Sequence, residues 1–131
     1  MKKIYCFGNP YIKEDSIALE LADILNADKE LNKRFQFIKC TSPDFLLNED
    51  VPDDLIIIDV VKGIDEVKVM HDIENLRLSK STTVHDFDLG NTLKLLKSRG
   101  YLKKVIIIAL PYAKEANKKQ VISLLSLNIP F

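Results

Sequence analysis

The sequence predicts an α/β fold, a three-layer α/β/α domain built around a five-stranded, mostly parallel mixed sheet. Continuous runs of branched apolar residues within Asp54–Val61 and Val105–Leu110 are typical of strands that are buried on both faces. Helical patterns separate the strand candidates, and this alternation favours a sheet with helices on both sides. The chain has 131 residues, so we expect one domain that spans residues 1–131.

Three further segments complete the predicted sheet. Lys3–Phe7 and Phe35–Cys40 are short apolar runs, whereas Val67–Ile73 has apolar residues at every second position. Such alternation indicates an edge strand with one solvated face. It also places His71 on the inward-facing side of that strand, where we expect a packing residue and not a ligand.

Three amphipathic helices are expected between and after the strands. The first follows Asp15 and Ser16, which are both good helix caps, and the second ends at Gly100. Their apolar stripes consist of Ile17, Leu21, Ile24 and Leu25, then Leu89, Leu93 and Leu96, then Val121, Leu124 and Leu125.

The composition of the chain bears on its possible partners and on its cellular compartment. The 19 basic and 19 acidic residues cancel, so neither nucleic acid nor an anionic membrane is an expected partner. Cys6 and Cys40 lie singly in apolar runs, which predicts two reduced, buried thiols. The first apolar stretch ends at Gly8, too soon for a signal peptide, and no segment is long enough to span a membrane. We therefore expect a cytoplasmic protein. We also expect it to be a monomer.

Polar residues with catalytic potential follow or interrupt the buried strands. They are Asp15 in the loop after the first strand, Asp59 inside an apolar run, and His85 before the second helix. The polar segment Glu74–Val84 is long enough, at about 3.3 Å per residue, to return His85 to the carboxyl edge, where open α/β sheets place their sites. Two carboxylates and an imidazole suit a borderline divalent ion such as nickel or zinc.

Each of these residues also has a structural interpretation. A buried carboxylate such as Asp59 needs a cation or several donors, and loop amides would satisfy it as well as a metal. Asp15 taken alone is typical of a helix cap, and His85 of a surface residue near a cap. Gly8 and Asn9 fit a simple turn and lack the further glycines of a phosphate or dinucleotide loop.

Four motifs in register resemble those of the hydrogenase maturation endopeptidases over nearly the whole chain. The first resembles the opening signature GNP-x(4)-D, the second an apolar strand that ends in Asp, and the third a histidine that opens a helix. The fourth is similar to the closing strand of the family. The matching residues are Gly8-Asn9-Pro10 with Asp15, Leu55–Val61 with Asp59, His85-Asp86 before Leu89, and Lys104–Pro111.

The sequence departs from the family pattern in several places, as a divergent member would. Lys13-Glu14 stands where Arg-Gly-Asp or a similar run is usual before the first acid. Ala18 replaces a glycine, Val60 stands where alanine is common, and the terminal region is short. None of these departures removes a residue that matches a ligand position.

The resemblance implies a fold and an activity. The fold is a phosphorylase/hydrolase-like sheet of order 2-1-3-5-4 with strand four antiparallel. The activity is removal of a C-terminal peptide from the large-subunit precursor of a nickel hydrogenase after nickel insertion. The resemblance implies that Asp15, Asp59 and His85 bind nickel supplied by that precursor, or another divalent ion, and act in catalysis. We also expect Gly8 and Asn9 to contact the substrate.

Two other functions are compatible with the residues alone. A non-catalytic module on the same fold would bind a metal or a partner without turnover. A small-molecule hydrolase or phosphorylase would need further anion-binding groups, and no basic cluster lies near the motifs.

Overall fold

The computed structural model describes residues 2–41, 54–71, 93–112, 115 and 118–129. They contain a five-stranded sheet of order β2-β1-β3-β5-β4, in which β4 alone is antiparallel to its neighbour. Its strands are β1 Lys2–Phe7, β2 Phe35–Cys40, β3 Asp54–Val61, β4 Lys68–Met70 and β5 Lys104–Pro111. The predicted α/β class, strand order and antiparallel edge strand are confirmed.

The centre of the sheet is the parallel pair β3 and β5. The two strands stay in register from Asp54 opposite Lys104 to Val61 opposite Pro111. Each strand is exposed only at its first residue and buried at the following seven. Continuous branched apolar sequences form these strands because both of their faces must pack against other side chains.

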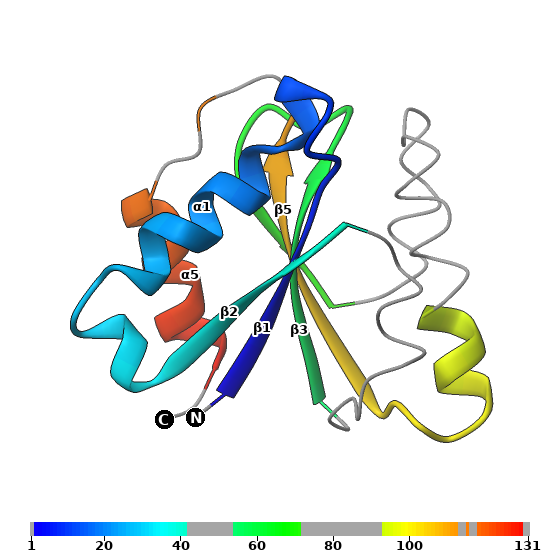
Figure 1. Ribbon diagram of the computed structural model, residues 1–131. Helices are drawn as coiled ribbons and strands as arrows, with labels where there is room; N and C mark the ends of the chain where they lie inside the picture. The colour runs from blue at the N-terminus through cyan, green and yellow to red at the C-terminus, as the bar shows by residue number, and fades with distance from the viewer. Residues whose placement is uncertain (1, 42–53, 72–92, 113–114, 116–117, 130–131) are drawn as a thin grey trace.

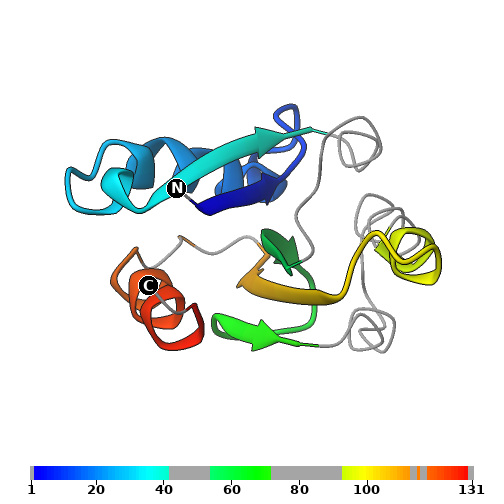
Figure 2. The same cartoon turned by 90° about the horizontal axis from the view of Figure 1, so that it is seen from below.

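Helices cover both faces of the sheet (Figure 1). Helices α1, Ile17–Asn26, and α5, Lys118–Asn128, lie together on one face, and the helical residues 93–98 lie on the other. Figure 2 shows the same three layers from below. Each face has its own apolar cluster: one includes Leu21 of α1 and Val121 of α5, and the other includes Leu93.

The carboxyl ends of β1, β3 and β5 lie at one edge of the sheet, the upper edge in Figure 1. The chain leaves β1 there through a loop and a short 3-10 helix, η1 Lys13–Asp15, before α1 begins. This carboxyl edge is where the sequence places Asp15 and Asp59.

The edge strand is shorter than its alternating pattern predicts. Val67–Ile73 was the expected strand, but β4 comprises only Lys68–Met70. His71 follows the strand and is exposed, so the prediction that it packs inward is wrong. The alternation does not fix its side chain because the residue lies beyond the last pairing with β5, which joins Met70 to Ile107. Residues 72–92, which include Glu74–Val84, lie outside the described part of the chain.

Both cysteines are buried free thiols, as predicted. Burial, and to a lesser degree the neighbouring Cys40, raises the pKa of the Cys6 thiol well above its ordinary value. Cys6 therefore stays protonated and acts as a small apolar side chain. Among the described helices, none is long and apolar enough to cross a membrane.

A side chain from α1 covers part of the outer edge of β2. The Asn26 carboxamide donates from Nδ2 to the carbonyl oxygen of Phe37 at 2.8 Å and accepts at Oδ1 from the Phe37 amide at 3.0 Å. A neighbouring strand would make the same two kinds of bond to Phe37. Asn26 thus occupies a position at which another chain could pair with the sheet.

We expect Asn26→Ala to destabilise the protein by about 1–2 kcal/mol. The substitution removes two hydrogen bonds and leaves the amide and the carbonyl group of Phe37 without the Asn26 carboxamide as their partner. Thermal unfolding should show a decrease in Tm of about 4 °C per kcal/mol, and size-exclusion chromatography should show more self-association. Gln36→Ala is the matched control, because Gln36 is exposed on the same strand. Equal Tm values for the two variants would contradict the role given to Asn26.

Candidate functional site

Asp15 is buried at the carboxyl edge by the loop that follows β1. Its side chain is only 2% exposed, and its Oδ2 accepts a hydrogen bond from the Asn9 amide at 3.1 Å. The Asp15 amide donates to the carbonyl oxygen of Ile12 at 3.0 Å, which closes the turn that leads into η1. The loop therefore fixes both the backbone and one carboxylate oxygen of Asp15.

Gly8 allows this loop to fold back over the end of β1. A Cβ atom at Gly8 would collide with the carbonyl oxygen of Asp15 and would lie 3.1 Å from Cγ of Leu19. The amide of Gly8 still donates to Cys40 of the neighbouring strand at 3.2 Å. Gly8 is thus held in the sheet while the residue after it begins the turn, and the absence of a side chain lets Asp15 approach.

The structure does not support a capping role for the Asp15 side chain. The N-cap residue of α1 is Ser16, and no side-chain hydrogen bond caps the helix. Ser16 instead donates from its hydroxyl to the carbonyl oxygen of Lys13 at 2.9 Å. The Asp15 carboxylate binds the Asn9 amide within its own loop, on the side of the loop that approaches β1.

Asp59 is completely buried near the end of β3. Its Oδ1 accepts a hydrogen bond from the amide of Val60 at 2.9 Å, and Ala109 of β5 lies opposite it in the ladder. Strand alternation places Asp59 on the same face as Ile57 and Val61, which belong to the cluster covered by residues 93–98.

Both carboxylates lie at the carboxyl edge, Asp15 in η1 after β1 and Asp59 in β3, the neighbour of β1. β1 and β3 are parallel, and Cys6 lies opposite Ile58. Asp59 is one residue beyond this pair, and Gly8, over which Asp15 folds, is two residues beyond it. A divalent cation stabilises buried carboxylates of this kind, because it offsets the cost of burying their charge.

His85 lies outside the described residues, and its place relative to the carboxylates stays a prediction. Among the described residues, no three His, Cys, Asp or Glu side chains form a group that could hold a metal ion. The helical residues 93–98, which follow His85 in the sequence, pack on the face of the sheet that Asp59 shares.

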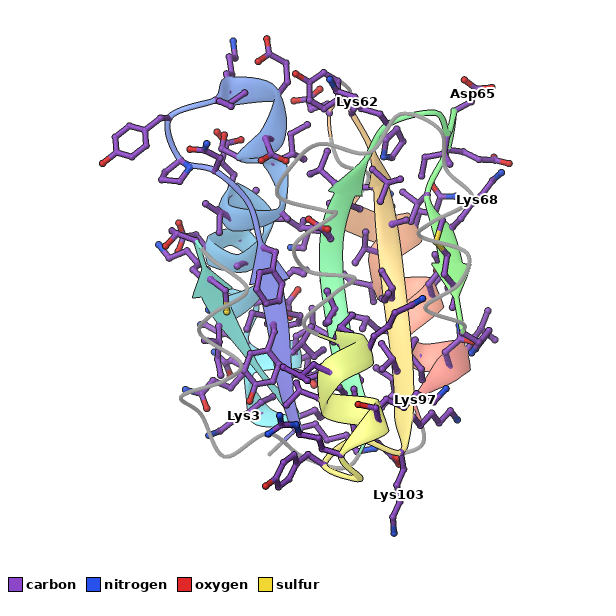
Figure 3. The ribbon with its side chains drawn as sticks, turned by 90° about the vertical axis from the view of Figure 1, so that its right-hand side faces the viewer. Lys3, Lys62, Asp65, Lys68, Lys97 and Lys103 are labelled. Carbon is purple, nitrogen blue, oxygen red and sulfur yellow. The ribbon has the colours of Figure 1, made fainter. Side chains whose placement is uncertain are left out.

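A lysine and a tyrosine also lie at the carboxyl edge, and the sequence analysis did not single them out. Lys62 follows β3, and its Nζ lies 4.5 Å from the centre of the Tyr112 ring. The Tyr112 amide donates to Val61 at 3.2 Å, which extends the contact between β3 and β5 past their last ladder pair. Figure 3 shows Lys62 and Asp65 at this end of the sheet, with Lys103 at the opposite end. The sequence feature that could have identified Lys62 and Tyr112 is their position directly after the two central strands, β3 and β5.

The fold and the two buried carboxylates define an α/β protein with a candidate site at the carboxyl edge of its sheet. A family model described as HycI, hydrogenase maturation protease, matches residues 41–125. This match covers more than half of the chain, which therefore belongs to the hydrogenase maturation protease family, a family of endopeptidases. No curated protein matches the chain by sequence.

Solved structures of such proteases share the fold. The hydrogenase maturating endopeptidase HybD from Escherichia coli is 16% identical, with a TM-score of 0.64 over 98% of this chain and 94% of that one. A further Escherichia coli endopeptidase is 18% identical, with a TM-score of 0.69 over the same shares of the two chains. The [NiFe] hydrogenase maturation protease HybD from Thermococcus kodakarensis is 18% identical, with a TM-score of 0.68 over 97% and 98%.

We expect Gly8→Ala to destabilise the protein and to displace the Asp15 loop, because the new methyl group meets a backbone oxygen that cannot rotate away. The free energy of unfolding should fall by about 2 kcal/mol, measured by denaturant titration. Gly100→Ala is the control: it has a φ of +78° and open space around its Cβ position, so it should cost about 1 kcal/mol from backbone strain alone. A Gly8→Ala protein as stable as the wild type would show that the loop does not need this close approach.

Proposed function

We propose that this protein removes the C-terminal extension from the large-subunit precursor of a nickel hydrogenase after nickel has been inserted. Asp15, Asp59 and His85 are the proposed ligands and catalytic residues. The observation that supports the site best is the burial of Asp15 and Asp59 at the same edge of the sheet: Asp15 lies in η1, which follows β1, and Asp59 lies in the neighbouring strand β3. Membership of the maturation protease family supports the reaction and the class of partner.

The nickel is best treated as part of the substrate. Structural metal sites usually have four protein ligands, and three ligands leave coordination positions open for groups from the precursor. Carboxylate and imidazole donors suit nickel or another borderline divalent ion. Bound nickel supplies Lewis-acid chemistry at a carbonyl group or a water molecule. A precursor without nickel would lack this activation and would remain uncleaved.

The surroundings of the carboxylates suit this task. Asp59 accepts the Val60 amide at Oδ1 and Asp15 accepts the Asn9 amide at Oδ2, so each side chain has a fixed orientation before the precursor arrives. Ligands that are already oriented lose little conformational freedom when they bind. Gly8 and Asn9 form the turn beside Asp15, and we propose that this turn contacts the substrate.

The state of the cysteines and the covering of the sheet bear on the cellular compartment and the oligomeric state of the protein. Buried free cysteines are typical of a reducing compartment, and we propose that the protein acts in the cytoplasm. We also propose that it acts as a monomer, because each face of the described sheet is already covered by helices of the same chain.

We expect the wild-type protein to shorten a nickel-loaded large-subunit precursor and to leave the nickel-free precursor intact. Asp15→Ala, Asp59→Ala and His85→Ala should each lower processing at least about a hundredfold, because each would remove a ligand. Mass spectrometry of the precursor measures the reaction, and circular dichroism checks that the variants fold.

His71→Ala is the matched control for His85→Ala, since His71 is exposed and lies outside the proposed ligand set. It should process the precursor at the wild-type rate. Equal cleavage of the nickel-loaded and nickel-free precursors would contradict nickel sensing. Binding of the precursor without cleavage would favour the non-catalytic binding module.

A further inference from the structure

The turn beside Asp15 presents two large apolar side chains to solvent. Tyr11 is 94% exposed and Ile12 is 43% exposed, although both lie within five residues of the buried end of β1. Neither side chain is needed to fill the core at these exposures. These two adjacent side chains form a small exposed apolar surface on the loop that carries Asp15.

Hydrogen bonds connect the backbone of these residues to the candidate site. The Tyr11 amide donates to Oδ1 of Asn9 at 2.9 Å, and the Asn9 amide donates to Oδ2 of Asp15 at 3.1 Å. The Ile12 amide donates to the Asn9 carbonyl at 3.2 Å, and the Ile12 carbonyl accepts from the Asp15 amide at 3.0 Å. The position of the Tyr11 backbone is therefore set by the same turn that positions Asp15.

We propose that Tyr11, assisted by Ile12, is a specificity-determining residue that binds an apolar side chain of the precursor next to the scissile bond. This inference rests on the proposed function and names a part of the protein that recognises the substrate. The occupant is the precursor segment that must reach Asp15 to be cut.

The position and chemistry of Tyr11 favour this occupant. Tyrosine is enriched among the residues that contribute most to binding, because its ring offers a large contact area with few rotatable bonds. Only three residues separate Tyr11 from Asp15 in the sequence, and the hydrogen-bonded turn at Asn9 holds both, so Tyr11 belongs to the same loop as the candidate ligand. The hydrogen-bonded turn fixes the base of the ring before binding, which lowers the entropy cost of association.

A second exposed tyrosine gives a matched control. Tyr101 is 63% exposed and follows the helical residues 93–98, before the start of β5. The side chain of Tyr101 has the same chemistry as that of Tyr11. Tyr101 lies far from the candidate site, because β5 starts at the opposite edge of the sheet from Asp15. Tyr11→Ala and Tyr101→Ala thus remove the same side chain at the two ends of the molecule.

The test combines cleavage kinetics with a binding measurement on the nickel-loaded precursor. Tyr11→Ala should raise KM about tenfold and leave kcat within about twofold, the pattern for lost binding that is uniform in ground and transition states. Tyr11→Phe should restore most of the affinity, because the ring provides the contact. Affinity is measured in the Asp59→Ala background, where no turnover is expected, with and without Tyr11→Ala.

The outcomes separate this inference from the proposed function. Unchanged KM and affinity for Tyr11→Ala, with normal wild-type cleavage, would overturn the role of Tyr11 and leave the protease activity intact. Equal losses for Tyr11→Ala and Tyr101→Ala would also overturn it, because the effect would then not depend on position. If the wild type binds the precursor without cleaving it, weaker binding by Tyr11→Ala still supports the docking role while the catalytic proposal fails.

Discussion

Burial of β3 on both faces is the constraint from which the arrangement of this protein follows. A strand with seven consecutive buried residues must pack against side chains on each side, and helices of the same chain provide them. Polar groups can then enter this region at low cost only near the strand ends, where loops meet solvent. Asp59 lies two residues before the end of β3, and burial of its carboxylate carries a desolvation cost that a cation would offset.

Much of the fold could be predicted from sequence because its strongest signals are local. The branched runs of β3 and β5 predict central strands with almost correct ends, and the helical stripes predict α1 and α5. The strand order is a different matter. It came from the resemblance to a family, because hydrophobic periodicity shows which faces are buried and does not show which strands are neighbours.

Side-chain roles were harder to predict because they depend on contacts between distant segments. The alternating pattern predicted a buried His71, but the strand ends at Met70 and the pattern loses its meaning there. Asp15 looked like a helix cap because of its position, whereas the turn at Asn9 uses its carboxylate. The pairing of Asn26 with Phe37 joins residues eleven positions apart and has no signature in either segment.

The residues that depart from the family pattern are not Asp15 or Asp59, and they lie on the surface or in the apolar core. Lys13 and Glu14 are exposed on η1, so their charges face solvent and not the buried side of the loop. Ala18 of α1 and Val60 of β3 are buried in the same apolar cluster. This cluster lies on the face of the sheet opposite to that of Asp59. The close approach that requires a glycine is at Gly8, and that glycine is present. The position of Asp15 depends on Gly8 and Asn9, and that of Asp59 on the end of β3.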